Sequence, residues 1–239
     1  MPLLLIKLFQ KIKATLHQCF DTVNVLSVQR TKRIFVLGDS HVLALRGSRG
    51  VFCQHLGPIT LNRFGRSGEA SQFLKNSFRL VWQRRLKVDY KPQNEPTLVL
   101  SFGEIDIRTH VFLQSELRQL PPTDIVKALA SSAINAIAEL RKTTQCRIVF
   151  LSPTPPTDIV DNPNFPTNGP LHLRIQWTRQ FSVEMEKKLI QSKIPYATIL
   201  NTSNLFATSF GSLPQDSSDG NVHYSKRIGK LIIQSIKLL

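Results

Sequence analysis

The 239-residue sequence predicts a three-layer α/β/α sandwich around a central parallel sheet of about five strands. Short apolar runs rich in β-branched residues alternate along the chain with longer stretches of helical periodicity, which is the order of βαβ units. Runs such as Leu98-Val99-Leu100 and Ile148-Val149-Phe150-Leu151 also lack the polar alternation of a half-exposed strand. Such continuous apolar strands are expected where helices cover both faces of a parallel sheet.

The elements are expected in alternating order from residue 33 onward. Strands are predicted over residues 33–37, 59–64, 97–102, 147–152 and 196–200, and helices over residues 67–86, 123–142, 171–191 and 225–239. Right-handed crossovers would bring the carboxyl ends of all these strands to one edge of the sheet. Two long segments, 152–170 and 201–221, are predicted as functional loops. We expect the first to wall a substrate cleft and the second to carry a C-terminal histidine.

Residues 1–30 differ from the rest and predict a basic amphipathic helical segment ahead of a single domain over residues 31–239. Lysines interrupt its apolar face and no small-residue cleavage site follows, so it is a poor signal peptide. The sequence leaves two roles open for this segment, which are packing on the domain and binding to an anionic membrane face. No stretch approaches the roughly 20 apolar residues of a membrane span. We therefore expect a cytoplasmic protein, with a peripheral position at an anionic membrane left open.

Three scattered cysteines, Cys19, Cys53 and Cys146, show neither a disulfide framework nor metal-ligand spacing, which favours a reducing compartment. The formal net charge is +15, and ten Lys or Arg residues lie between His41 and Lys91 against two acidic residues. The positive electrostatic field of such a cluster attracts an anionic surface or a polyanion. No nucleic-acid-binding signature accompanies it, so nucleic acid is not favoured. The alternative is a solvated basic face without a partner.

The strongest local signal is Gly38-Asp39-Ser40-His41, which directly follows the first apolar run. A serine at this turn would stand at the ligand-binding edge of the sheet, beside the free amide groups that begin a helix. Ser40 is therefore a candidate nucleophile. The alternative is that Ser40 only caps the helix that follows.

Three further segments come later in the chain. They are Gly65-Arg66-Ser67-Gly68-Glu69, Gly103-Glu104-Ile105-Asp106 and Asp219-Gly220-Asn221-Val222-His223. With the Ser40 turn, and in this order, the segments resemble the four blocks of the GDSL/SGNH hydrolase superfamily. The resemblance covers residues 33–239 and implies the flavodoxin-like fold of that superfamily.

The resemblance also implies a catalytic apparatus that needs no metal or cofactor. Ser40 would be the nucleophile, His223 the general base and Asp219 the carboxylate that orients His223. The backbone NH groups of Ser40 and Gly65 would form the oxyanion hole. The superfamily usually has Asp-x-x-His, whereas Asp219 precedes His223 by one residue more, and Asp216 is the fallback partner.

The third block departs from the superfamily pattern, because Ile105 stands where an asparagine would donate to the oxyanion. Either another group replaces this donor, for which Arg108 and His110 are the candidates, or the site is slow. The residues expected to bind substrate or support the site are Asp39, Glu104, Asp106, Arg108 and His110. The alternative is that Glu104, Asp106 and Arg108 form a self-satisfied ion-paired loop.

The third block also resembles a variant of the superfamily found in bacterial surface-polysaccharide contexts. We therefore expect a serine esterase or O-acyltransferase that acts on a short acyl ester, carried by a small ester or an acylated glycan. The alternative is a catalytically weak protein of the same fold that binds a glycan, an anionic membrane surface or nucleic acid. The residues by themselves do not separate a hydrolase from an acyltransferase.

Overall fold

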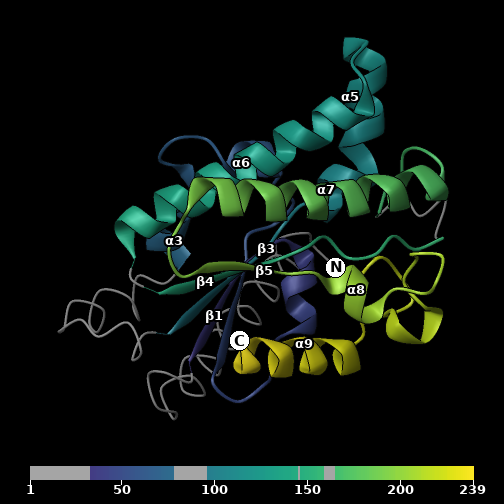
Figure 1. Ribbon diagram of the computed structural model, residues 1–239. Coiled ribbons are helices and arrows are strands. Elements are labelled where there is room, and N and C mark those ends of the chain that lie inside the picture. Colours follow the sequence, from purple (N-terminus) through teal and green to yellow (C-terminus); the bar gives the residue numbers. More distant parts are fainter. Residues whose placement is uncertain (1–32, 78–95, 145, 159–164) are drawn as a thin grey trace, which may run out of the picture.

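The computed structural model describes residues 33–77, 96–144, 146–158 and 165–239. Its centre is one parallel sheet of five strands in the order β2-β1-β3-β4-β5. The strands are β1 Ile34–Gly38, β2 Val51–His55, β3 Thr97–Ser101, β4 Arg147–Leu151 and β5 Ala197–Leu200. Helices lie on both faces of the sheet (Figure 1), which confirms the predicted α/β sandwich.

Alternate residues of each central strand enter two separate apolar cores, one on each face of the sheet. Phe35 and Leu37 of β1 belong to the larger core, whereas Ile34 and Val36 of the same strand belong to the other. Side chains of a strand point alternately to opposite faces, so a strand buried on both sides has no polar positions. This explains the continuous apolar runs of the sequence.

The larger core is covered by α2 Leu61–Phe64, α3 Glu69–Ser77, α6 Pro122–Thr143 and α7 Leu171–Ser192. The opposite core is covered by the short 3₁₀ turn η2 Ser40–Ala44 and by α9 Lys226–Leu238. Figure 1 shows α6 and α7 together on one side of the sheet and α9 on the other. The remaining elements are η4 Asp106–His110, which is π-helical, α5 Val111–Arg118, α8 Thr202–Phe206 and the 3₁₀ turn η5 Gln215–Ser217.

The predicted strand over residues 59–64 is wrong. The second strand is β2, and residues 61–64 form the short helix α2. Thr60 begins this helix, because its side chain accepts a hydrogen bond from the Arg63 backbone NH. A short apolar run fits either a strand or a buried helical turn, and the capping threonine decided for the helix.

The other predictions need smaller changes. Helices α6, α7 and α9 lie within a few residues of their predicted bounds. Helix α5 was missed, and the predicted 201–221 loop contains α8 and η5. The predicted segment 1–30, Cys19 and the second half of the predicted helix 67–86 lie outside the described residues. Within the described part of the chain, no helix is long and apolar enough to cross a membrane.

Helix α9 packs directly on the turn that carries Ser40. A Cβ atom at Gly229 would lie 2.0 Å from the Ala44 carbonyl oxygen of η2. Only a residue without a side chain permits this approach of two backbones. Helix α9 therefore supports the η2 turn through this close backbone contact.

Candidate active site

Ser40 lies at the carboxyl end of β1, as the first residue of η2. The Asp39 side chain caps this turn, accepting a hydrogen bond from the His41 backbone NH at 3.0 Å. Ser40 is therefore not the capping residue, and its hydroxyl is available for another partner. As the first residue of η2, its backbone NH has no acceptor within that turn.

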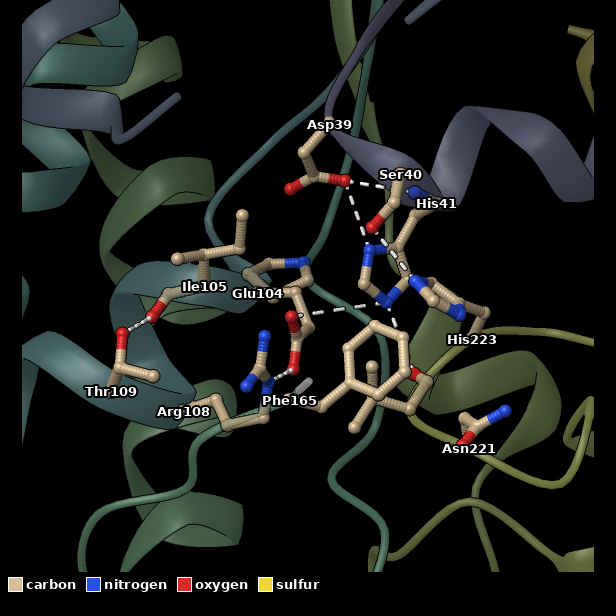
Figure 2. Close-up of polar contacts among 12 residues, drawn as sticks. Asp39, Ser40, His41, Glu104, Ile105, Arg108, Thr109, Phe165, Asn221 and His223 are labelled. Carbon is tan, nitrogen blue, oxygen red and sulfur yellow. Dashed lines mark hydrogen bonds and ion pairs between the residues drawn. The ribbon is translucent and has the colours of Figure 1, made fainter. Parts of the chain in front are cut away.

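The Ser40 hydroxyl meets His223, which is 183 residues away in the chain. The Ser40 Oγ lies 2.7 Å from the His223 Nε2, and the His223 Nδ1 lies 3.1 Å from an Asp219 carboxylate oxygen. The carboxylate requires a proton on Nδ1, so Nε2 is the acceptor and the Ser40 hydroxyl donates to it. Figure 2 shows Ser40 and His223 pointing toward one another. This is the geometry of a hydroxyl nucleophile, a base and an orienting carboxylate.

The loop before α9 is built so that Asp219 reaches His223. Its two ends are joined where Ser218 and Tyr224 form an antiparallel bridge, and the Asp219 NH donates to the His223 carbonyl at 3.1 Å. The other Asp219 carboxylate oxygen accepts the Asn221 NH at 2.9 Å. This closed turn absorbs the additional residue between Asp219 and His223. Asp216, the alternative partner, accepts instead from Arg227 at 3.2 Å.

The surroundings of His223 favour its neutral form. Burial lowers the pKa of His223, the positive charge of His41 lowers it further, and Asp219 opposes both. Phe165, from the long loop after β4, packs edge-on against the His223 ring with centroids 5.0 Å apart. A neutral imidazole is the form that can accept the serine proton.

His41 is a second histidine at the site, which sequence reasoning did not assign to it. It is 3% exposed, and its ring centroid lies 4.7 Å from that of His223. Burial by itself would lower the pKa of His41, but the carboxylates of Asp39 and Glu104 outweigh it and raise the pKa to about 9. Only the position of His41 next to Ser40 pointed to it in the sequence.

Glu104 and Arg108 form a buried ion pair beside this histidine. The Arg108 Nε donates to Glu104 at 2.6 Å, and a terminal guanidinium nitrogen donates to the Pro166 carbonyl at 2.5 Å. Arg108 is only 7% exposed. Two of the guanidinium donors are used in this way. The contacts of Glu104 and Arg108 therefore fit the alternative of an ion-paired loop better than the predicted role of Arg108 as replacement oxyanion donor.

Asp106 and His110 lie further from the serine. Asp106 is buried and accepts the Leu61 backbone NH of α2 at 2.9 Å, and burial raises the pKa of this carboxyl to about 7. It therefore supports the fold around the site. His110, at the end of η4, is half-buried and makes no hydrogen bond or ion pair with Ser40 or His223 among the described residues.

Gly65 does not fit the predicted role of oxyanion donor. Its NH donates to the Leu61 carbonyl at 2.8 Å, within the turn of α2. Its lack of a side chain serves packing, because a Cβ at Gly65 would lie 2.4 Å from the Ser132 carbonyl oxygen of α6. The expectation that Gly65 follows a strand is wrong for the same reason, since it ends a helix.

Ile105 offers no side-chain donor, and its carbonyl accepts the Thr109 hydroxyl at 2.5 Å. Of the two predicted backbone oxyanion donors, the Gly65 NH is used within α2, whereas the Ser40 NH is left uncommitted by these contacts. No group of three or more His, Cys, Asp or Glu side chains in the described ranges is placed to hold a metal ion.

No protein-family model and no curated protein sequence matches the chain. Solved structures do. A GDSL-like lipase from Bacteroides thetaiotaomicron is 13% identical with a TM-score of 0.52, covering 91% of this chain and 95% of its own. A candidate acylhydrolase from Bacteroides fragilis is 17% identical with a TM-score of 0.50, covering 87% of both chains. The chain has the GDSL/SGNH hydrolase fold.

A third similar structure, described as a candidate platelet activating factor from Streptococcus pneumoniae, extends over the whole molecule. It is 13% identical, with a TM-score of 0.54, and covers 99% of this chain and 98% of its own. At these identities the similarity concerns the fold. This fold brings together the Ser40 turn after β1, the η4 segment after β3 and the His223 loop before α9. The chemistry of the site depends on those residues and not on the fold alone.

Proposed function

We propose that this protein is a serine hydrolase that cleaves esters through Ser40, His223 and Asp219. The observation that carries the proposal is the continuous chain of contacts from the Ser40 hydroxyl through the His223 ring to the Asp219 carboxylate. The fold shared with GDSL-like lipases and acylhydrolases supports it.

In the first half of the reaction, the Ser40 Oγ attacks the ester carbonyl carbon while its proton moves to the His223 Nε2. The Ser40 NH donates to the oxygen that becomes negative. As the tetrahedral intermediate collapses, the carbon–oxygen bond of the ester breaks, and His223 returns the proton to the departing alcohol. Asp219 keeps the imidazole in the required tautomer and stabilises its protonated form.

In the second half, a water molecule attacks the acyl group on Ser40 as His223 removes its proton. The acid leaves, and the proton passes back to the Ser40 oxygen. A sugar hydroxyl in place of that water would make the protein an O-acyltransferase with the same residues. We propose a short acyl group on a carbohydrate as the substrate, because the Gly103 to Asp106 block resembles the polysaccharide-associated variant of the superfamily.

Labelling with a fluorophosphonate probe tests the nucleophile. Wild-type protein is expected to react, the Ser40→Ala variant is expected not to, and Ser209→Ala, at an exposed serine of the loop after α8, is expected to react like the wild type. Equal labelling of wild type and Ser40→Ala, or no labelling of either, would overturn the proposal.

A second candidate function is favoured by the sparse oxyanion donors. Ile105 cannot donate, the Gly65 NH is used within α2, and Arg108 is held by Glu104 and Pro166. Loss of one oxyanion donor costs about 100-fold to 1000-fold in turnover where it has been measured. A protein so limited would bind an acylated glycan with little turnover. Two measurements distinguish the two functions. Calorimetry measures the binding of acetylated and deacetylated oligosaccharides to Ser40→Ala, and a kinetic assay measures the turnover of the same ligands by the wild type.

A further inference from the structure

His41 joins the two segments that carry the nucleophile and the base. Its Nδ1 lies 2.9 Å from the Asp39 carboxylate, in the turn that ends at Ser40. Its Nε2 lies 3.1 Å from the backbone carbonyl of Val222, the residue before His223. One buried ring therefore bridges two segments that are 181 residues apart in the chain.

Both partners of the His41 ring are acceptors. A carboxylate oxygen and a peptide carbonyl oxygen each need a hydrogen, and a neutral imidazole carries only one. Both contacts are satisfied together only when the ring is protonated at both nitrogens. The hydrogen-bond geometry by itself therefore selects the imidazolium form of His41.

The charges around His41 fit this form. The Asp39 carboxylate is 1% exposed, and a Glu104 carboxylate oxygen lies 3.9 Å from the His41 Nε2. The other Glu104 oxygen is neutralised by Arg108. The buried side chains thus form a chain of alternating negative and positive charges, in the order Asp39, His41, Glu104 and Arg108. If His41 were neutral, the two carboxylates would share the single positive charge of Arg108.

We propose that His41 is a positioning residue, an imidazolium clamp that holds the Ser40 turn against the His223 loop and keeps a positive charge beside the His223 ring. This inference rests on the proposed function, because it assigns His41 a part in the same reaction. It does not give His41 contact with the substrate, since both nitrogens of its ring are used by protein acceptors.

The clamp has a consequence for His223 as a base. The groups that face the His223 ring are the Ser40 hydroxyl, Asp219, Phe165 and His41, with Glu104 behind His41. Of these, the His41 cation opposes a second positive charge on His223 and lowers its pKa. His223 then stays neutral, and able to accept the Ser40 proton, down to a more acidic pH than it would without the clamp.

The charge on His41 is tested first by NMR titration of the imidazole nitrogens, which needs no catalysis. The Ser40→Ala variant is the background, so that the result is independent of turnover. His41 is expected to stay an imidazolium through neutral pH, and adding His41→Gln is expected to raise the titration midpoint of His223. His172→Gln, at an exposed residue of α7, is the matched control and should leave that midpoint in place. A neutral His41 at pH 7 would overturn the proposal, as would an unmoved His223 midpoint in a folded His41→Gln protein.

The part played in the reaction is tested on the otherwise wild-type protein. His41→Gln is expected to lower kcat by about tenfold to a hundredfold, the scale of a misplaced catalytic group, with a smaller effect on KM. It is also expected to move the acid limb of the pH profile of kcat/KM to higher pH. A merely structural role would lower activity at all pH values and leave that limb in place, which would overturn the assignment. If fluorophosphonate labelling disproves the serine hydrolase, the NMR titrations still decide whether the clamp exists.

Discussion

At the scale of single residues, the division of work between Asp216 and Asp219 is set by the turn before α9. Asp219 uses one oxygen to accept the Asn221 NH and the other to contact the His223 Nδ1. Asp216 lies in η5 and forms an exposed ion pair with Arg227. The two carboxylates are therefore a matched pair for mutagenesis.

Asp219→Asn is expected to lower kcat by at least roughly a hundredfold, because an amide cannot hold His223 in the tautomer that accepts from Ser40. Asp216→Asn is expected to leave kcat close to wild type, since an exposed ion pair contributes only about 0–1 kcal/mol. Steady-state kinetics with a nitrophenyl ester measures both. Equal losses in the two variants would contradict the assignment of Asp219.

Ile105 offers a second test at this scale. Ile105→Asn restores the amide that the superfamily places in this block, and it is expected to raise turnover by roughly tenfold or more if the amide reaches the oxyanion. Ile105→Val is the control, because it changes the side chain without adding a donor. Unchanged turnover in Ile105→Asn would place position 105 away from the reacting oxygen.

At the scale of elements, Arg108 connects η4 to the loop that begins after β4. It donates to Glu104 and to the Pro166 carbonyl, and the Asn168 NH donates back to the Arg108 carbonyl at 2.8 Å. Phe165 of the same loop packs on His223. Phe165, Pro166 and Asn168 therefore pack η4 and His223 together.

Arg108→Ala is expected to destabilise the fold by about 3–5 kcal/mol, because it leaves the Glu104 carboxylate buried without its cation. Denaturant unfolding measures the change. Lys127→Ala removes an exposed ion pair with Asp124 and is expected to cost less than about 1 kcal/mol. A small effect of Arg108→Ala would mean that water replaces the guanidinium beside Glu104.

At the scale of the whole molecule, His41 links protonation to folding. Its pKa of about 9 in the folded protein lies above the ordinary value near 6.5 of an unfolded chain. The folded state then binds more protons between these values. The stability due to His41 is complete below about pH 6.5 and is lost as the pH rises through about 9. Thermal unfolding is expected to show this decline, His41→Gln should flatten it, and His172→Gln should not.

The net charge of +15 is also a property of the whole molecule. Arg49, Arg63, Arg66 and Lys75 are exposed, and five other cations of the basic segment lie outside the described residues. We propose that this segment recruits an anionic polymer or an anionic membrane face.

Binding to heparin-like glycan, anionic vesicles and DNA is expected to weaken with salt, because the screening length falls from about 10 Å at 0.1 M to about 3 Å at 1 M. Replacing the four exposed cations with glutamine is expected to weaken binding to the same three ligands. Binding that does not change with salt or with these substitutions would contradict electrostatic recruitment.

What the sequence by itself determined is local. The apolar runs predicted β1, β3 and β4, because these strands are buried on both faces, and a shorter apolar run predicted the half-buried edge strand β5. Helical periodicity predicted α6, α7 and α9. The resemblance of the motif order to the superfamily placed Ser40 and His223 in one candidate site. Strand geometry predicted only that the segments that follow β1 and β3 lie at one edge of the sheet. The second strand was mispredicted where a short apolar run was ambiguous and Thr60 started a helix.

The tertiary structure alone decided which groups are available for chemistry. It paired Asp219 rather than Asp216 with His223, engaged the Gly65 NH and Arg108 elsewhere, and set His41 between Asp39 and Val222. Each of these outcomes depends on which acceptor a donor finds. Donors and acceptors far apart in the chain come within hydrogen-bond distance only after the helices have packed on the sheet. The periodicity of a single segment therefore does not predict which of them pair.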